Sequence, residues 1–489
     1  MVEDFSIRII NDQDIRQSLI AFKNAISEEN VEIKNDELYE KLVSLLKDED
    51  PKIRKNAAII LGSFKKASVK DVLLTGYKNE KIDFVKEGYL KGLSKQNCKS
   101  IIKDLKAIQA SLLADENSDQ KHIQAQLKIL NPLIRSYGSH KKKMIKLLHK
   151  PVDVILTTLP YYQFTLFEYL IDRKLKYKPV GQGVLVRTNS VYDLLDYRNY
   201  KDMIIPLKGC ALMEKDGDII AEKLIHSNLL DLLDNLFDND GVFYYKITDT
   251  FREKDPKLLD TVLRAMLKAY PKKLLNATRN YEIEILLKEL RPGKISAYLK
   301  LSILHNPRFD YRKEVISNSM QPYVAATMME VAKPYMKERA RVLDPFVGSG
   351  ITLIERCMMK PTRFALGLDI YAKGIEAAKR NAKAAELDIH FITKDALRFV
   401  NNEMFDEIVT DMPTYAQMHN KESLTKLYDT FFDRIKRLVK ANGYVFIYTS
   451  EIALIEKNLR LQKDYLTLIE HYDVPRGRHL HYFFIIQVK

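Results

Sequence analysis

The sequence predicts a multidomain protein: an N-terminal α-helical repeat, then an α+β module, then an α/β domain with a parallel sheet. Apolar residues at helical spacing indicate the repeat over residues 1–150, and short strands and helices in mixed order indicate the module over 151–310. Four apolar strands that alternate with amphipathic helices indicate the last domain, over 311–489. A chain of 489 residues is long enough for several hydrophobic cores.

The most informative segment is 341–350, which reads R-V-L-D-P-F-V-G-S-G. It predicts a buried strand ending in Asp344, then a tight turn through Gly348 and Gly350, then a helix over 351–359. Such a unit is typical of nucleotide binding, but the segment lacks both G-x-G-x-x-G and Gly-Lys-Ser/Thr. Because Asp344 would repel a phosphate, we expect a cationic or polyol ligand, such as the amino-acid end and ribose of S-adenosylmethionine.

Three further apolar segments, 364–368, 389–393 and 407–410, predict strands that also lead into an acid. The four acids are Asp344, Asp369, Asp395 and Asp411. The carboxyl ends of parallel strands meet at one edge of a sheet, where ligands bind. We therefore expect Asp369 to bind a ribose diol and Asp395 to meet the adenine edge.

From residue 318 onward the sequence resembles class I S-adenosylmethionine-dependent methyltransferases, and within them the THUMP-associated RNA guanine-N2 methyltransferases. The likeness rests on the glycine loop, on Ser-Met-Gln-Pro at 319–322 and on Asp-Met-Pro at 411–413. It implies a Rossmann-like fold, S-adenosyl-L-methionine as cofactor, and RNA, especially tRNA, as substrate. The cofactor-binding residues that it implies are Asp344, Phe346, Gly348, Gly350, Asp369, Asp395 and Asp411.

The Asp-Met-Pro segment resembles the catalytic motif of the same family. An exocyclic purine amine is a poor nucleophile because its lone pair is delocalised into the ring. Two acceptors that bind its N–H groups can aim the lone pair at the methyl group, and we expect Asp411 and a carbonyl near Pro413 to supply them. The family usually has an aromatic residue and then glycine after the proline, whereas this chain has Thr414 and Tyr415. We expect Tyr415 to stack on the flipped base from a shifted position.

Two alternatives remain open at this point. One is adenine-N6 methylation of rRNA or DNA, which an N-P-P-Y/F motif would have favoured over Asp-Met-Pro. The other is a non-catalytic RNA-binding or assembly protein that retains the cofactor fold, and Thr414–Tyr415 together with the long helical region favour it.

The composition points to a polyanionic partner. The chain has 79 Lys and Arg against 65 Asp and Glu, a net charge of +14. Such a charge favours binding to phosphate backbones without sequence preference. Cys98, Cys210 and Cys357 are far apart and show no ligand spacing, so we expect no metal site and a reducing compartment. No signal peptide or run of transmembrane length is present, which predicts a cytoplasmic protein without a membrane partner.

The N-terminal region contains a repeat signature. The segments 48–54 and 57–62, D-E-D-P-K-I-R and A-A-I-I-L-G, resemble a HEAT-type repeat. Val85 and Leu93 repeat the positions of Ile53 and Leu61 after 32 residues. We expect residues 104–148 to continue as helix, and the repeats to bind RNA or a protein partner.

The middle region, 151–310, reads as paired strands with helices, and its order resembles the ferredoxin-like and THUMP region of the same family, an RNA-binding module. The apolar segment 152–157 predicts a strand, and segments 281–287 and 296–302 predict two strands joined by a turn at Arg-Pro-Gly-Lys. The aromatic run 243–246 predicts a buried strand. Near the C-terminus, Arg476 and Arg478 precede the last strand, but exposed loop arginines are common and we do not include them in the site.

Overall fold

The computed structural model describes most of the chain. Its residues group by compactness into two units, one of 1–146 and 206–304 and one of 147–205 and 305–489. The predicted domain boundaries at residues 150 and 310 remain predictions. The described residues are 2–29, 33–115, 120–137, 143–181, 183–238, 241–271, 273–317, 319–477 and 479–489.

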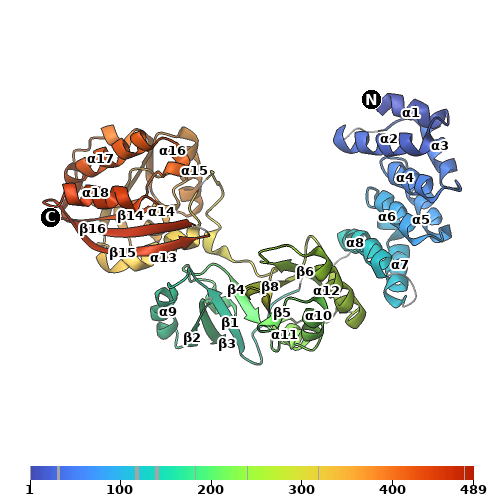
Figure 1. Ribbon diagram of the computed structural model, residues 1–489, viewed down its shortest axis with the longest axis horizontal. Helices are drawn as coiled ribbons and strands as arrows, with labels where there is room; N and C mark the ends of the chain where they lie inside the picture. Colours follow the sequence, from blue (N-terminus) through green and yellow to red (C-terminus); the bar gives the residue numbers. More distant parts are fainter. Residues whose placement is uncertain are drawn as a thin grey trace. The chain divides into compact units, whose positions relative to one another are not determined.

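The first unit begins with paired helices, drawn in blue to cyan in Figure 1. Their bounds are α1 (Val2–Ile10), α2 (Ile15–Glu29), α3 (Asp36–Leu45), α4 (Pro51–Leu61), α5 (Val69–Asn79), α6 (Asp83–Leu93), α7 (Ile102–Ala114, after a 3-10 turn at Lys99–Ile101) and α8 (Gln120–Tyr137). Asp50 caps α4 by accepting a hydrogen bond from the Lys52 amide, and Pro51 starts the helix.

The 32-residue echo in the sequence corresponds to α4 and α6, which pack closely side by side. A Cβ atom added at Gly62 would lie 2.5 Å from the backbone of Gly92. The equivalent helices of successive repeats therefore touch through glycine, where no larger residue fits. The prediction of helix over 104–148 was wrong at its end, because α8 ends at Tyr137 and Ile145 pairs with Phe237 as extended chain. That pairing buries both side chains.

The rest of the first unit is a small sheet with helices. Its strand order is β9-β8-β6-β7, with β5 beside β9. The predicted hairpin is confirmed as β8 and β9, which pair antiparallel, and the aromatic run is confirmed as buried residues of β6. The bounds are β5 (Met213–Glu214), α10 (Gly217–Ile225), α11 (Leu229–Leu236), β6 (Phe243–Asp249), α12 (Pro256–Ala269), β7 (Leu274–Asn276), β8 (Ile283–Arg291) and β9 (Lys294–Leu301).

The second unit contains an antiparallel set of strands from residues 147–205 in the order β2-β3-β1-β4. The predicted strand at 152–157 is confirmed with the same bounds. The elements are β1 (Val152–Thr157), α9 (Phe167–Asp172, after a 3-10 turn at Gln163–Leu166), β2 (Lys176–Val180), β3 (Gly183–Thr188) and β4 (Met203–Pro206).

The C-terminal segment of this unit is a Rossmann-like sheet in the order β12-β11-β10-β13-β14-β16-β15. It is parallel from β12 to β14, and β16 and β15 continue it antiparallel. The elements are α13 (Pro322–Ala332), β10 (Ala340–Asp344), α14 (Ile351–Met359), β11 (Thr362–Asp369), α15 (Ala372–Ala384), β12 (His390–Thr393), β13 (Phe405–Asp411), α16 (Tyr415–Met418), α17 (Lys421–Leu438), β14 (Val439–Thr449), α18 (Ile452–Leu461), β15 (Leu466–Arg476) and β16 (His479–Val488).

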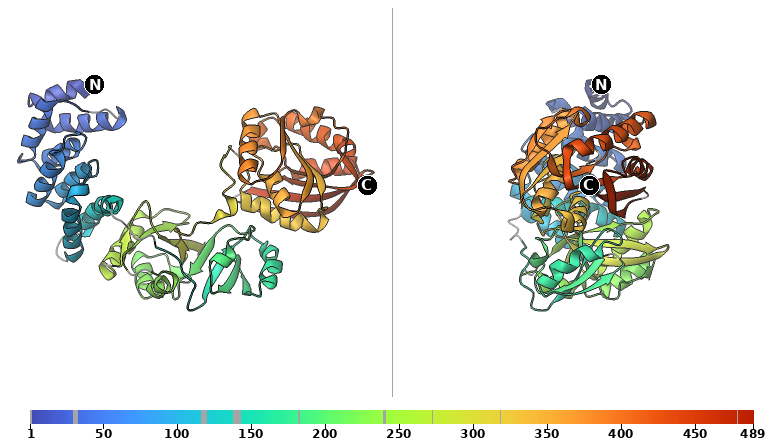
Figure 2. Two further views of the ribbon diagram at one scale, coloured as in Figure 1. Left: turned by 180° about the vertical axis from the view of Figure 1, so that it is seen from behind. Right: turned by 90° about the vertical axis from the view of Figure 1, so that its left-hand side faces the viewer.

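Helices cover both faces of this sheet (Figures 1 and 2). One core contains buried residues of α13, α14 and α15, and the other contains the apolar side of α17 with part of α18. Sheets covered on both faces consist of nearly continuous apolar strands. This explains why the strands were readable from the sequence.

A fully buried ion pair fixes α14, the helix after the glycine loop, against β13. Arg356 donates from Nε to Glu407 at 2.7 Å, and both side chains are completely buried. The second oxygen of Glu407 accepts the Lys337 amide, and the remaining Arg356 nitrogens donate to the carbonyls of Lys337 and Lys360. Because these polar groups are paired, the pair holds the helix and the strand in one arrangement.

We expect Glu407→Ala to destabilise this arrangement by about 3–5 kcal/mol, because it leaves the Arg356 charge buried without its partner. Hydrogen exchange of the α14 and β13 peptides measures the change as faster exchange. The matched control is Glu403→Ala, since Glu403 pairs with Arg341 but its side chain is 68% exposed. Equal exchange rates in the two variants would contradict the structural role of the buried pair.

Candidate active site

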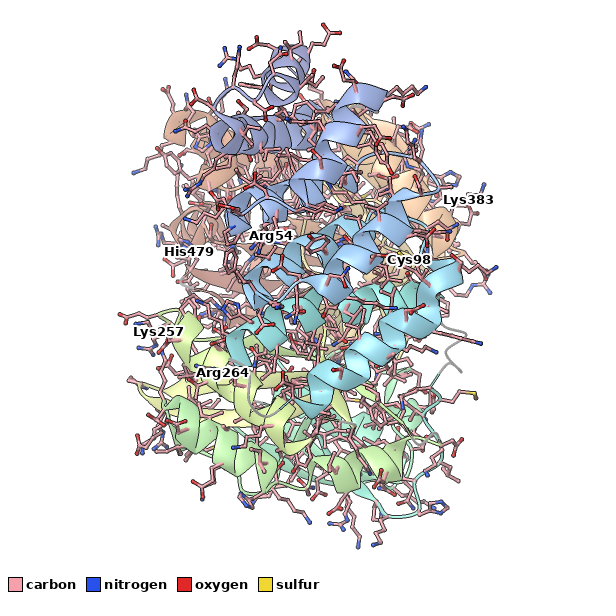
Figure 3. All side chains as sticks on the ribbon, turned by 90° about the vertical axis from the view of Figure 1, so that its right-hand side faces the viewer. Arg54, Cys98, Lys257, Arg264, Lys383 and His479 are labelled. Carbon is pink, nitrogen blue, oxygen red and sulfur yellow. The ribbon has the colours of Figure 1, made fainter. Side chains whose placement is uncertain are left out.

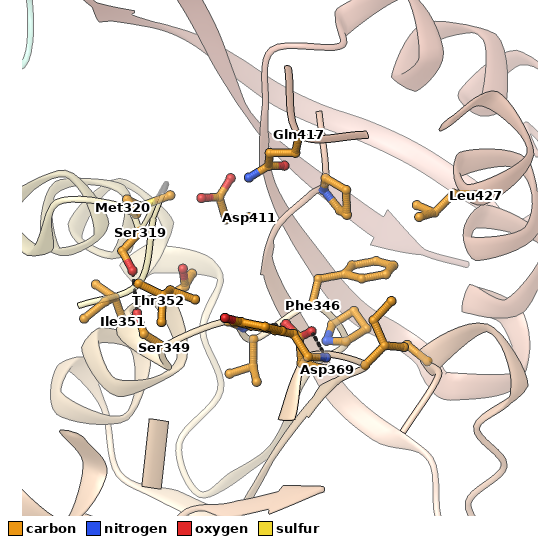
Figure 4. A pocket seen from close by; sticks show the side chains of 18 of the residues that line it. Ser319, Met320, Phe346, Ser349, Ile351, Thr352, Asp369, Asp411, Gln417 and Leu427 are labelled. Carbon is orange, nitrogen blue, oxygen red and sulfur yellow. Dashed lines mark hydrogen bonds between the residues drawn. The ribbon is translucent and has the colours of Figure 1, made fainter. Parts of the chain in front are cut away.

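The carboxyl edge of the parallel sheet surrounds a cavity of about 670 Å³. The turns after β10, β11, β12 and β13 line it, together with Ile316, Ser317, Ser319 and Met320, which precede α13. Figure 4 shows Asp411 and Gln417 on one side of this space and Asp369 on the other. Of the predicted site residues, the cavity brings together Phe346, Gly348, Asp369, Asp395, Asp411 and Pro413.

Asp344 lies behind the cavity at the end of β10 and is only 1% exposed. Its Oδ1 accepts the Phe346 amide at 3.1 Å, whereas Oδ2 has no hydrogen-bond partner among the described residues. Burial raises the pKa of this carboxyl well above its usual range, and the charges of Asp411 and Asp369 raise it further. A cation in the cavity would relieve both effects.

The glycine loop places its backbone where side chains would interfere. Gly348 and Gly350 have φ angles of 51° and 86°, which are strained for other residues. The Gly348 amide donates to Asp369 at 2.8 Å, and a Cβ atom at Gly350 would lie 3.1 Å from Ala378. Gly350 thus lets α14 start close to α15, while Gly348 presents backbone to the cavity.

Asp369 and Asp395 are held by backbone amides. Asp369 accepts the amides of Gly348 and Tyr371, one on each oxygen, both at 2.8 Å. Asp395 accepts the Leu397 amide at 2.9 Å. A carboxylate oxygen has further lone pairs, so both residues can also accept hydroxyl or amine donors from a ligand.

Asp411 is the last residue of β13, and it lines the cavity. Burial raises the pKa of its carboxyl to about 7, and the nearby Arg476 charge opposes this rise. Arg476, at the end of β15, is therefore a charged neighbour of the site. The sequence did not predict this role, because the local pattern of β15 does not reveal that the strand ends at this edge of the sheet. Arg478 lies outside the described residues.

The backbone after Asp411 is fixed by a chain of hydrogen bonds. The Tyr428 hydroxyl donates to the Pro413 carbonyl at 3.0 Å and lies 2.7 Å from the Thr449 hydroxyl. Thr449 in turn accepts the Glu451 amide at 3.0 Å, and Glu451 accepts the Tyr415 amide at 3.0 Å. This ring ties the turn to α17 and to the end of β14, so the carbonyl of Pro413 has a fixed direction.

Thr414 and Tyr415, which depart from the family pattern, start the short helix α16. Thr414 and Gln417 form a reciprocal capping box, which explains a threonine at this position. Tyr415 is 52% exposed and does not line the cavity. Gln417 and Met418 from the same helix do line it.

Three predicted site residues, Asp344, Gly350 and Tyr415, lie outside the cavity lining. Several lining residues were missed, and two of them, Ile370 and Tyr371, directly follow Asp369 and could have been found from that position. Others depend on the fold: Leu427 comes from α17, and the Ser319 and Ser349 hydroxyls, 2.7 Å apart, join two distant segments. In the described parts of the chain, no three His, Cys, Asp or Glu residues gather in a metal-binding cluster.

Family models match two segments of the chain. Residues 310–480 match the RMKL-like methyltransferase domain, and residues 12–94 match HEAT repeats. The C-terminal segment is thus a methyltransferase domain that uses S-adenosylmethionine, and the N-terminal helices are HEAT repeats. The site fits this cofactor, because the unpaired buried oxygen of Asp344 behind the cavity suits a cation, and Asp369, held by two backbone amides, suits a diol.

Curated relatives share part of the chain. The release factor glutamine methyltransferase of Flavobacterium psychrophilum is 24% identical over 48% of this chain and 82% of its own length. The tRNA (guanine(6)-N2)-methyltransferase of Thermus thermophilus is 30% identical over 33% of this chain. The match spans only 49% of that tRNA enzyme.

Solved structures share the fold. TrmN from Thermus thermophilus has a TM-score of 0.52 and 20% identity, over 69% of this chain and all of its own. A methyltransferase complexed with SAH has a TM-score of 0.54 and 12% identity, over 69% of this chain and 98% of its own.

We expect Asp344→Asn to weaken S-adenosylmethionine binding about 10- to 100-fold, because a hydrogen bond to a charged group contributes about 1.5–3 kcal/mol. Titration calorimetry measures the loss, with Asp388→Asn, an exposed acid, as the matched control.

The same substitution should raise the melting temperature of the cofactor-free protein at pH 8. The raised pKa of Asp344 means that its contribution to folding is present below the ordinary carboxyl pKa and is lost as pH rises. Asparagine at position 344 does not ionise, so the variant should not lose this folding stability at pH 8. A variant that binds normally and melts no higher would contradict the assignment.

Proposed function

We propose that this chain, which carries an RMKL-like methyltransferase domain after HEAT repeats, methylates an exocyclic amine of RNA, with guanine N2 of tRNA as the target. The position of Asp411 carries the proposal: its carboxylate lines the cofactor cavity as an acceptor and belongs to a turn that hydrogen bonds hold in place. The tRNA guanine-N2 methyltransferases among the relatives support the choice of nucleotide.

The proposed chemistry is a direct displacement in which the bound cofactor supplies an electrophilic methyl group. Asp411 and a backbone carbonyl at Met412–Pro413 accept the two N–H groups of the amine and turn its lone pair toward that methyl group. Asp344 holds the cationic end of the cofactor, Asp369 holds its ribose, and Asp395 meets its adenine edge. Gln417 and Met418 contact the base, and Tyr415 stacks on it only if α16 moves on binding.

Recognition of RNA is proposed to involve the middle region as a THUMP-like, ferredoxin-like module. The match to TrmN spans 69% of this chain, more than the segment 310–480 alone provides, which supports a shared arrangement beyond the catalytic domain. A net charge of +14 supports a polyanionic substrate in the cytoplasm. No helix in the described ranges is long and apolar enough to span a bilayer.

A second candidate is methylation of a glutamine in a protein. The release factor enzyme matches over 82% of its own length, a larger share than for the tRNA enzymes. A glutamine amide, like an exocyclic purine amine, has a delocalised lone pair, so the same two acceptors would suit it. Adenine-N6 methylation uses the same chemistry, but the Asp-Met-Pro motif does not favour it.

A substrate panel distinguishes these candidates. We expect labelled methyl groups from S-adenosylmethionine to enter total RNA from cells that lack the enzyme, and not DNA or release factors. The RNA label should fall at least about 10²-fold in Asp411→Ala, because the amine is then no longer aimed. Label in protein alone would replace the proposal with the second candidate.

The raised pKa of Asp411 predicts a pH dependence. The deprotonated carboxylate is a much stronger N–H acceptor than the protonated acid, so kcat/KM should rise with pH around a midpoint near 7. Asp411→Asn keeps an acceptor oxygen but cannot titrate. Its residual activity should therefore be flat between pH 6 and 8, and a variant that keeps the wild-type midpoint would assign the titration to another group.

A further inference from the structure

The HEAT repeats contain a second cavity, of about 670 Å³, whose lining is basic. Its charged residues are Lys65, Lys66, Lys70, Lys95 and Lys99, and the remaining lining residues are Ala67, Gln96, Asn97 and Ser100. No acid lines it. We call this set the lysine concavity, and Cys98, labelled in Figure 3, stands between two of its residues.

The lysine concavity forms because corresponding loops of two repeats lie side by side. One loop follows α4 and the other follows α6. The side-chain amide of Gln96 donates from Nε2 to the carbonyls of Gly62 and Phe64 at 2.8 and 2.9 Å, and Lys95 donates to the Ser63 hydroxyl at 3.0 Å. These bonds hold the lysines of both loops around one space.

The start of α5 adds positive potential to the same place. Lys70 belongs to its first turn, and its N-cap residue Ser68 makes no capping hydrogen bond, since the Ser68 hydroxyl is engaged with Tyr39 at 2.9 Å. The first amides of a helix carry a partial positive charge and attract anions. Helix and lysines therefore favour the same kind of ligand.

One lysine of the concavity has an acidic partner that also holds it in place. Lys66 pairs with Asp36 at 2.7 Å and lies over the Tyr39 ring. A second groove of the same repeats, lined by α5 and by the turns after α3 and α5, is different, because there Asp48, Asp71 and Glu80 accompany the basic residues. The two hollows of the repeats thus differ in charge.

We propose that the lysine concavity binds the phosphate backbone of the RNA substrate. This inference rests on the proposed function, in that it identifies where the repeats hold the RNA which the catalytic domain modifies. Lysine ammonium groups act as point charges on phosphates, so the contact is independent of base sequence. It places RNA binding, rather than protein binding, on this face of the HEAT repeats.

The test measures the dissociation constant of the full-length chain for fluorescein-labelled, unmodified tRNA by anisotropy between 50 and 300 mM KCl. The variant is Lys70→Gln/Lys95→Gln/Lys99→Gln. The matched control, Lys47→Gln/Lys52→Gln/Lys81→Gln, removes equal charge from exposed lysines of the same repeats outside the concavity. Circular dichroism of both variants verifies that the helices are intact.

We expect the first variant to bind at least 10-fold more weakly than the control at 150 mM KCl. Its salt slope should be smaller by about 2, since each lost phosphate contact removes about 0.7–0.9 from it. Equal affinity and slope in the two variants would overturn the inference, as would tighter wild-type binding to vesicles of anionic lipid than to tRNA. The measurement needs no methyl transfer, so a chain that binds tRNA through these lysines but methylates only protein would refute the proposed function alone.

Discussion

A buried carboxylate with one unpaired oxygen is the constraint on which the catalytic domain depends. Asp344 ends the central strand β10, lies almost completely buried behind the cavity, and is near enough to Asp411 and Asp369 for their charges to raise its pKa further. An isolated charge in such a place is costly, which favours a cation as its partner. We propose that the cationic amino-acid end of S-adenosylmethionine is this partner, and that the positive φ angles of the glycine loop allow the cofactor to approach the backbone. Under this proposal, electrostatics at one strand end select the cofactor.

The rest of the domain keeps this edge rigid. The buried Arg356–Glu407 pair fixes α14 to β13 under the loop, and Tyr428 fixes the turn after Asp411. A further node joins residues 147–205 to the same helix, because Arg198 forms an ion pair with Glu355 at 2.6 Å and Tyr311 donates to the same carboxylate. The side chains in these contacts do not line the cavity. Together they hold in place the helix, strand and turn that carry the lining residues.

Much of the fold was predictable from the sequence. The central strands of the C-terminal sheet are buried on both faces and therefore apolar, and several helices begin at recognisable capping residues, prolines or glycines. The helix over 351–359 and the strand over 152–157 were predicted with their bounds, and the repeat spacing of α4 and α6 follows from apolar positions 32 residues apart. The acids of the site were predictable because they follow strands. Leu427, Gln417 and Arg476 were not, since α17, α16 and β15 reach the cavity only through tertiary packing. The exposed position of Tyr415 depends on the capping box of Thr414, which a family pattern does not reveal.

The most direct test is the identity of the methylated nucleoside. RNA from cells that lack the enzyme is incubated with the purified chain and deuterium-labelled S-adenosylmethionine, digested, and separated by chromatography with mass detection. The account predicts label in N2-methylguanosine, at a level that disappears in Asp411→Ala. Label in N6-methyladenosine would contradict the guanine assignment while keeping the acceptor geometry, and absence of label from RNA despite normal cofactor binding would contradict the account.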